Sequence, residues 1–477
     1  MNVRRSTLLA FGLLAGTAAL MAAQGGGGAQ QAQAPATPDP VQILVDRLTL
    51  DSYKATLKGL TQFGDRREGT QRNRDAVAWI EAQLKSYGCQ TERMTYVPAP
   101  RGGGGNRGGA AGAAGAGAAG AAGAGAAGAG AAGGGAAGAG AAGRAGAGGA
   151  ATAGGAAAAG AGGAQGRGAG GGRGPQPPAT VLTEPNRRGT GGSTYYGITR
   201  PTGVNNSAEN QPNEALRKLN SGPVLPDPFP QVFCTKWGTT RRGEMFIIGA
   251  HMDGIGYGEA ANDDGSGTAL VMELARVFSM PDVTTDVTIR FALWNGEEGG
   301  LNGANAYVNQ RKDLQGQPNE PRWLGMIQHD MMMWDHGMPR ADGTLNPEQR
   351  PEADFNIEFQ TNSDRADTCT AKAEIPTCSK DLAFAVKAAA DKYSKNYPGT
   401  VGPHMTNTDS GPFMNIVPAI SLRENERGMH TGAGWNPHWH QPTDLFSTFS
   451  DKDFTLGLNS AQATLSAIAG LSKAKVK

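Results

Sequence analysis

The stretch EMFIIGAHMDGIGYGEAANDDGSGTALVMELARVFSM, residues 244–280, contains the elements that decide the fold. EMFIIGA is an apolar run typical of a buried strand, and GTALVMELARVFSM has the apolar spacing of a helix. His251 follows the strand directly and Asp253 comes two residues later, in a chain of 477 residues that has only seven histidines. A histidine and a carboxylate placed there suggest half of a metal site.

The same alternation of strand and helix continues toward the C-terminus. DVTIRFALWN, WLGMIQHD and IVPAISL are further strand-like runs. Together with residues 244–280 they predict an α/β sheet with helices on both faces. Sites in such folds form at the carboxyl ends of strands, so the polar residues after each strand are the candidates for function.

Two helical patterns precede this region. The second, TQRNRDAVAWIEAQLKSYGC, places Val77, Ile80 and Leu84 on one face and stops at Gly88. It leads into a strand, CQTERMTYV, and QVFCTKW predicts another strand much later in the chain.

A long insertion, recognised by its composition, separates these two strands in the sequence. Residues 101 to about 175 are almost wholly Gly and Ala, in a chain with 74 glycines. Interleaved glycine costs a helix about 1 kcal/mol per position relative to Ala, and no large apolar side chain is available to pack, so we expect disorder. The polar stretch that follows is expected to wrap the surface as a loop. Residues 101–225 thus interrupt one catalytic domain, formed by residues 41–100 and 226–477.

The first residues predict export. Residues 1–23 combine Arg4 and Arg5, an apolar stretch and small residues, as in a signal peptide, and residues 24–40 are a Pro/Gln/Ala-rich linker. The adjacent arginines leave a twin-arginine route open. The apolar run is too broken by Gly and Thr for a good membrane span, so we expect no stable membrane insertion after signal removal and a periplasmic or extracellular location.

The charge balance excludes one class of partner. The chain has 43 basic and 42 acidic residues, a net charge of +1. A protein that binds the phosphate backbone of nucleic acids normally carries a surplus of basic residues. We therefore expect no nucleic-acid partner.

Four cysteines suit an exported protein, in which disulfides persist. Cys369 and Cys378 lie nine residues apart in a loop-like segment, and Cys89 and Cys234 each lie in a strand-like run. We predict the pairs Cys89–Cys234 and Cys369–Cys378. Four cysteines allow three connectivities, and free buried thiols are the other alternative.

Polar residues gather after the predicted strands and late in the chain. They are His251, Asp253, Asn262, Asp263, Asp264, Glu297, Glu298, Asp330, His438, His440 and Asp444. Two imidazoles and three carboxylates suit a pair of divalent ions, preferably zinc, whereas a single zinc needs only three or four ligands. Taken alone, His-x-Asp is more often a structural pair, adjacent glutamates are usually a solvated face, and NDDGSG is typical of a helix-capping turn. Their joint order favours the metal site.

HMDGIGYGEAANDDGSG, LWNGEEGGLNG, QHDMM and HQPTD together resemble the co-catalytic zinc aminopeptidase family of metallopeptidases. That family also includes glutamate carboxypeptidases, carboxypeptidase Q and, on the same fold, glutaminyl cyclases. The resemblance covers roughly residues 45–100 and 226–475. It implies a three-layer α/β/α fold of the zinc-peptidase (phosphorylase/hydrolase-like) type, with a mixed, mostly parallel central sheet, two Zn²⁺ per chain and peptide substrates.

The resemblance also implies a role for each matching residue. The implied metal ligands are His251, Asp263, Glu298, Asp330 and His440. Asp263 matches the carboxylate that bridges both ions, and Asp330 and His440 match ligands of one and the same zinc. Glu297 matches the general base, since one of two neighbouring glutamates can bind metal while the other takes a proton.

Neighbouring residues are expected to support this set. Asp253 should accept a hydrogen bond from the other ring nitrogen of His251, and Asp444 should close the loop that holds the ligand. His438 is an alternative to His440, because alternate residues of an extended segment share a face. His329 should point to the opposite face of its strand, as a core or hydrogen-bonded histidine.

These features together predict an exported zinc-dependent exopeptidase, most readily an aminopeptidase. One alternative is a carboxypeptidase or dipeptidase of the same family, in which Arg423 or Arg427 could hold a terminal carboxylate. The others are a glutaminyl cyclase-like enzyme with one zinc and a catalytically inactive scaffold domain.

Overall fold

The computed structural model describes residues 39–98, 194–195, 198–199, 204–334, 355–402, 408–424, 436 and 438–477. From Pro40 to the C-terminus the chain is one unit. The expectations for the signal peptide, for most of the linker and for the Gly/Ala tract lie outside the described residues.

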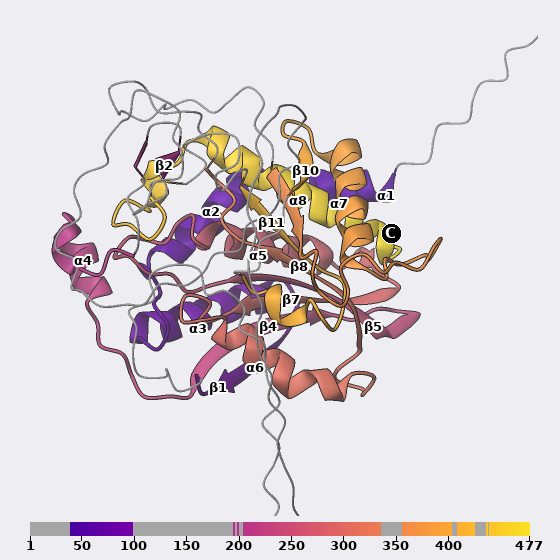
Figure 1. Cartoon of the computed structure of the whole chain (residues 1–477), viewed down its shortest axis with the longest axis horizontal. Coiled ribbons are helices and arrows are strands. Elements are labelled where there is room, and N and C mark those ends of the chain that lie inside the picture. The colour runs from indigo at the N-terminus through magenta and orange to yellow at the C-terminus, as the bar shows by residue number, and fades with distance from the viewer. Residues whose placement is uncertain are drawn as a thin grey trace, which may run out of the picture. The chain divides into compact units, whose positions relative to one another are not determined.

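An eight-stranded sheet forms the middle layer (Figure 1). Its strands are β1 (Gln90–Tyr96), β4 (Phe229–Lys236), β5 (Arg241–His251), β7 (Val287–Trp294), β8 (Arg322–His329), β9 (Phe355–Phe359), β10 (Gly399–Gly402) and β11 (Ala419–Glu424). Their order is β1-β4-β7-β5-β8-β11-β9-β10. The central strands β7, β5, β8 and β11 are parallel, whereas β4 is antiparallel to β1 and β7, and β9 to β11. The predicted mixed, mostly parallel sheet is confirmed.

Helices cover both faces of this sheet (Figure 1). The helices of the described chain are α1 (Pro40–Asp46), α2 (Leu50–Thr61), α3 (Gln71–Ser86), α4 (Glu214–Asn220), α5 (Gly265–Phe278), α6 (Asn302–Arg311), α7 (Ser379–Tyr393) and α8 (Asp451–Leu471). Helices α2, α3, α5, α7 and α8 bury apolar side chains in a large core on one face. On the other face α6 packs over a smaller core rich in aromatic rings, including Trp294, Tyr307 and Phe413. This is the expected three-layer arrangement.

Two short strand pairs lie outside the main sheet. They are β2 (Thr194–Tyr195) with β3 (Ile198–Thr199), and β6 (Val283–Thr284) with β12 (Lys475–Val476). The second pair connects the C-terminal end of the chain to the segment that precedes β7. β12 is thus held against β6, which lies just before β7.

Helix α3 shows how the predicted apolar face folds. The side chain of Thr70 caps its N-terminus by accepting a hydrogen bond from the backbone N–H of Asn73 at 3.3 Å. Val77, Ile80 and Leu84 are fully buried, as predicted. Burying each such side chain contributes roughly 1.5–3 kcal/mol relative to leaving it exposed. Gly88 follows with a left-handed backbone (φ 79°), which ends the helix where the sequence predicted.

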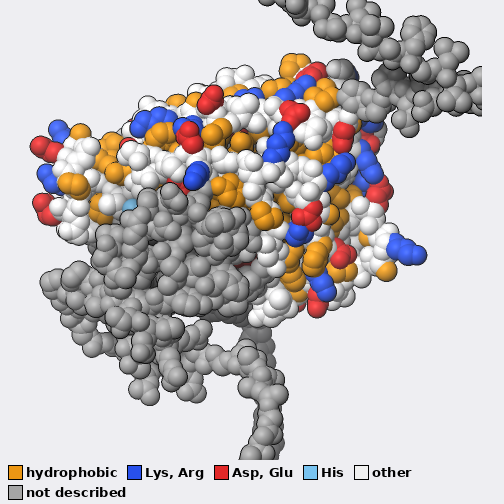
Figure 2. Space-filling view, turned by 90° about the horizontal axis from the view of Figure 1, so that it is seen from above, with side chains coloured by type: hydrophobic (Ala, Val, Ile, Leu, Met, Phe, Trp, Pro, Cys, Tyr) orange, Lys and Arg blue, Asp and Glu red, His pale blue; other side chains and the backbone are white. Residues whose placement is uncertain are grey.

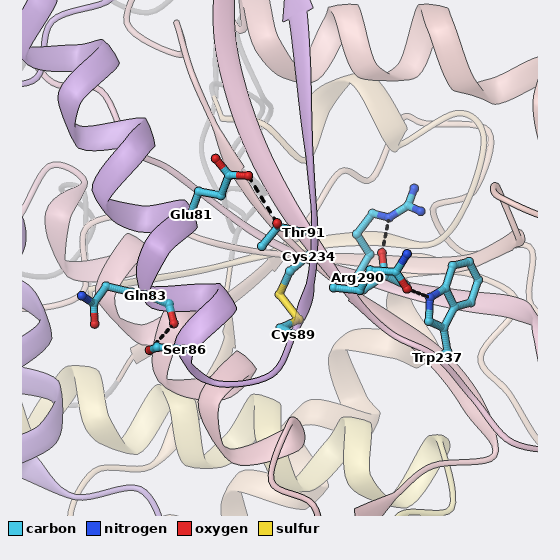
Figure 3. The surroundings of a disulfide bond; sticks show 10 residues. Glu81, Gln83, Ser86, Cys89, Thr91, Cys234, Trp237 and Arg290 are labelled. Atoms are coloured by element: carbon cyan, nitrogen blue, oxygen red, sulfur yellow. Dashed lines mark hydrogen bonds between the residues drawn. A yellow bond between two sulfur atoms is a disulfide. The ribbon is translucent and has the colours of Figure 1, made fainter.

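Both predicted disulfides are present, and no cysteine is free. Cys89 follows α3 and joins Cys234 of β4, which is paired with β1 opposite Thr91 (Figure 3). The bond spans 145 residues of sequence and so connects the two sides of the insertion. Cys369 and Cys378 close a short loop before α7.

The described surface carries charges of both signs (Figure 2). No described helix is long and apolar enough to cross a membrane. On the face shown in Figure 2, Lys and Arg side chains are interspersed with Asp and Glu. Export and the lack of a nucleic-acid partner stay predictions.

Candidate metal centre

Three adjacent parallel strands carry most of the predicted site. His251 is the last residue of β5, Asp330 directly follows β8, and Glu297 and Glu298 follow β7 by three and four residues. Because β7 and β8 flank β5 in parallel, their carboxyl ends meet at one edge of the sheet. His440 comes instead from a loop before α8.

The predicted residues form two groups that could each hold a metal ion. They are His251 with Glu297 and Asp330, and Asp263 with Glu298 and His440. Within each group one ligand atom per residue lies within 4.8 Å of the others. Asp263 faces both groups, because its Oδ1 lies 3.3 Å from Nε2 of His251 and its Oδ2 lies 3.0 Å from Nε2 of His440.

The grouping of Asp330 corrects one expectation. Asp330 lies 3.8 Å from Nε2 of His251, whereas Glu298 lies 2.9 Å from Nε2 of His440. Asp330 therefore belongs with His251, not with His440 as the resemblance implied. The cause is strand order, because β8 is hydrogen-bonded directly to β5 and their ends lie side by side.

Asp253 supports His251 chiefly through its backbone. Its carbonyl oxygen lies 3.0 Å from Nδ1 of His251, and its carboxylate is more distant at 3.8 Å. The carboxylate instead accepts the backbone N–H groups of Glu297 at 3.2 Å and Glu298 at 3.4 Å. Asp253 thus positions the two glutamates as well, a role that the sequence did not indicate.

The loop that carries Asp263 is held from two sides. The carboxylate of Asp444 accepts the backbone N–H groups of Asn262 at 2.8 Å and Asp263 at 3.1 Å. This fits the structural role expected for Asp444. The side chain of Asn262 also donates to Glu424 at 2.8 Å. Asp264 caps α5 by accepting from the backbone N–H of Gly267, so NDDGSG contains both a site residue and a helix cap.

Buried carboxylates dominate the electrostatics of the site. Burial raises the pKa of Glu298 to about 7. Burial also raises the pKa of Glu297, and the nearby charges of Glu298 and Asp330 raise it further. Burial alone would lower the pKa of His440, but the charges of Glu298 and Asp263 raise it to about 10. Protons on the histidines therefore neutralise the same carboxylates that divalent cations would neutralise.

The remaining histidines near the site have other partners. His438 places Nδ1 2.8 Å from the hydroxyl of Thr443, and its ring lies edge-on to Trp334. His329 points to the opposite face of β8, where Nε2 lies 2.9 Å from the hydroxyl of Thr464. Burial lowers the pKa of His329 to about 3, as suits a core histidine.

Arg423 lies beside the site in a role that the sequence did not predict. Its Nη2 donates to Oδ2 of Asp330 at 2.6 Å, and both side chains are buried. The sequence offers Arg423 or Arg427 for a substrate carboxylate, but Arg423 is engaged with Asp330, and Arg427 lies outside the described residues. Recognising this pair requires the knowledge that β11 lies beside β8.

Comparisons with known proteins show what the chain is similar to. Residues 233–456 match Peptidase family M28. An aminopeptidase of Pseudomonas aeruginosa is 32% identical over 137 residues, 25% of this chain and 24% of that protein. Aminopeptidase YwaD of Bacillus subtilis is 39% identical over 66 residues, 14% of each chain. The chain thus spans about a quarter or less of the length of these relatives.

One solved structure shares the fold at low identity. The LapA aminopeptidase of Legionella pneumophila has a TM-score of 0.50 and 14% identity, covering 94% of this chain and 79% of that one. The family match confirms the resemblance to the co-catalytic zinc aminopeptidase family.

Proposed function

We propose that this chain, whose residues 233–456 match Peptidase family M28, is an exported two-zinc exopeptidase that removes N-terminal residues from peptides. One observation carries the proposal: Asp263 presents one oxygen to His251 at 3.3 Å and the other to His440 at 3.0 Å. A carboxylate shared between two histidine-carboxylate groups suits a pair of ions bound close together.

The donor atoms fit zinc at both positions. His251 and Asp330 would hold one ion and His440 and Glu298 the other, with Asp263 between them. Oε1 of Glu298 and Nδ1 of His440 are buried without a hydrogen-bond partner among the described residues, so Glu298 has a ligand oxygen to spare. Zinc bound there would polarise the scissile carbonyl and make a water molecule nucleophilic near neutral pH.

Glu297 is the proposed general base. It lies in the group of His251 and Asp330, while its neighbour Glu298 contacts His440. Burial, with the charges of Glu298 and Asp330, raises the pKa of Glu297. A raised pKa suits a carboxylate that takes a proton from the attacking water and returns it to the departing amine.

Charge favours an aminopeptidase over a carboxypeptidase. Buried Asp330 and Asp409 lie near Glu297, and buried Asp253 accepts its backbone N–H. Arg423, the described cation that contacts this group, is paired with Asp330. With zinc bound to Asp263, Glu298 and Asp330, carboxylates that bind no metal, such as Asp253 and Asp409, would still attract a free α-ammonium group and repel a terminal carboxylate.

Mass spectrometry of a peptide panel tests the proposal. Zinc-loaded protein should shorten peptides with free N-termini one residue at a time, and N-terminal acetylation or a chelator should stop the reaction. Loss of residues from the C-terminus would point to a carboxypeptidase. Cyclisation of N-terminal glutamine would point to a cyclase, and no reaction on any peptide would favour an inactive scaffold. Export is tested separately, by sequencing the N-terminus of protein recovered outside the cytoplasm.

A further inference from the structure

The 204–228 segment, which follows the insertion and includes α4 at the left of Figure 1, bonds to both loops that flank the site. One is the 252–262 loop, between His251 and Asp263. The other is the 440–444 loop, which begins with His440. Among the residues that bond to them, Gln211 is 1% exposed and contacts both loops at once.

Gln211 uses all of its amide hydrogen-bonding groups. Its Nε2 donates to the carbonyl oxygen of Tyr257 at 2.7 Å and to that of Pro442 at 3.0 Å. Its Oε1 accepts the backbone N–H of Asn213 at 3.0 Å. The two donors therefore bridge the 252–262 and 440–444 loops, and the acceptor fixes the direction of the amide.

Asn205 makes a second connection to the same two loops. Its backbone N–H donates to the carbonyl oxygen of His440 at 3.0 Å, and its side chain donates to the carbonyl oxygen of Gly256 at 3.1 Å. The loops also touch directly, because a Cβ at Gly256 would lie 2.4 Å from the carbonyl carbon of His440. Backbone contacts thus fix the position of His440.

His440 depends on these contacts more than His251 does. Nδ1 of His251 lies 3.0 Å from the carbonyl oxygen of Asp253, whereas Nδ1 of His440 has no hydrogen-bond partner among the described residues. His440 also has a left-handed backbone, with φ 56°, which persists in a non-glycine residue only when its surroundings hold it.

We propose that Gln211, assisted by Asn205, is a positioning residue for His440. By tying the 440–444 loop to the 252–262 loop, it keeps Nε2 of His440 within 3.0 Å of Asp263 and 2.9 Å of Glu298. The proposal rests on the proposed function, because its consequence is the selective retention of the zinc that His440 would hold.

Asn220 provides a matched control within the same segment. It is also buried, its Nδ2 donates to the carbonyl oxygen of Gly258 at 2.7 Å, and its Oδ1 accepts the backbone N–H of Asp65 at 3.0 Å. Those bonds go to the 252–262 loop and to Asp65, not to the 440–444 loop. A purely structural role for the segment predicts the same result for Gln211 and Asn220, and a positioning role predicts different results.

The test compares Gln211→Met with Asn220→Leu, two nearly isosteric changes that remove the amide. Zinc per chain is measured against buffered free zinc, and the unfolding midpoint is measured with zinc removed. We expect the larger of the two zinc dissociation constants, that of the more weakly bound ion, to rise roughly 10- to 100-fold in Gln211→Met. The smaller dissociation constant should stay unchanged. Asn220→Leu should lower the unfolding midpoint but leave both constants unchanged.

A double-mutant cycle identifies the affected position. In a His440→Ala background, Gln211→Met should not lower the affinity for the remaining zinc ion. In a His251→Ala background, it should lower that affinity. The proposal would be overturned if Gln211→Met raised both zinc dissociation constants equally or changed neither. It would also be overturned if Asn220→Leu caused the same selective loss of affinity. If Gln211→Met does not fold, Gln211→Asn replaces it, with the same expected direction. Wild-type protein that binds no zinc would instead reject the proposed function itself.

Discussion

The two histidines of the candidate site are held in different ways. His251 ends a central strand, its Nδ1 lies against the carbonyl of Asp253, and its neighbour Asp330 is paired with buried Arg423. His440 lies in a loop, has a left-handed backbone and has no partner for Nδ1 among the described residues. The sheet therefore fixes the half of the site that contains His251, which we call the strand half. Contacts between loops fix the half that contains His440, the loop half.

The difference shows what each kind of scaffold supplies. Strand ends in a parallel sheet converge without help from other segments, because neighbouring strands share hydrogen bonds along their length. A loop ligand has to be placed by bonds from residues distant in sequence, such as Asn205 and Gln211. If this contrast is right, changes to the two halves should have unequal consequences.

The largest effect is expected where the halves meet. Asp263→Asn removes the carboxylate that contacts both His251 and His440, so both ions should be lost and peptide hydrolysis should fall to background. Zinc content and product mass spectrometry measure this, with circular dichroism to verify the fold and Asp75→Ala, an exposed change on α3, as the control. Retention of two zinc ions would show that the halves do not share this ligand.

The adjacent glutamates separate catalysis from metal binding. Glu297→Gln should lower kcat roughly 10²- to 10⁴-fold with zinc content unchanged, because it removes only a proton acceptor. Glu298→Gln should instead release the zinc of the loop half, since Glu298 contacts His440 at 2.9 Å. Full activity in Glu297→Gln would remove Glu297 from the mechanism.

Direct comparison of the histidines tests the contrast between the two halves. The zinc that remains in His440→Ala, held by the strand half, should bind roughly 10-fold more tightly than the zinc that remains in His251→Ala. Oriented ligands lose less freedom on binding than ligands that depend on loop contacts. Competition with a chromogenic chelator gives both dissociation constants. The reverse order would contradict the division into a rigid and a loop-dependent half.

The same contrast explains how far the sequence could predict the fold. Val77, Ile80 and Leu84 fall on one helical face, and the strands ending at His251 and before Asp330 are apolar runs, so local pattern was enough to find them. The order of the strands depends on contacts between distant segments. For that reason the local pattern does not predict the pairing of Asp330 with His251.

The site divides in the same manner. His251 and Asp330 could be inferred from their places after strands, whereas the choice of His440 over His438 required the resemblance carried by HQPTD. Gln211 lies in a polar stretch that indicates only a surface loop. Its function depends on two carbonyl groups, of Tyr257 and Pro442, that come together only in the folded chain.

The far face of β8 gives a smaller, pH-dependent prediction. Burial lowers the pKa of His329 to about 3, below the value of about 6.5 expected in the unfolded chain. The unfolded state therefore binds a proton first as the pH falls, and stability is lost from about pH 6.5 downward. In zinc-free protein this should cost about 1 kcal/mol between pH 7 and 5.5. The free energy of unfolding, measured in urea at several pH values, should depend less on pH in His329→Gln. An unchanged dependence on pH would mean that another group titrates.

The smallest effect is expected from cutting the chain between the strands that flank the insertion. A specific protease site placed after Arg144 would separate β1 from the 204–228 segment in sequence, but Cys89–Cys234 and the pairing of β1 with β4 still join the two pieces. Because the 204–228 segment acts through hydrogen bonds to the loops, we expect both zinc ions to stay bound and activity to change less than about twofold. The pieces should separate on a gel only after reduction. Loss of the loop-half zinc on cleavage would mean that covalent continuity through the insertion, and not the contacts of Gln211 and Asn205, holds His440 in place.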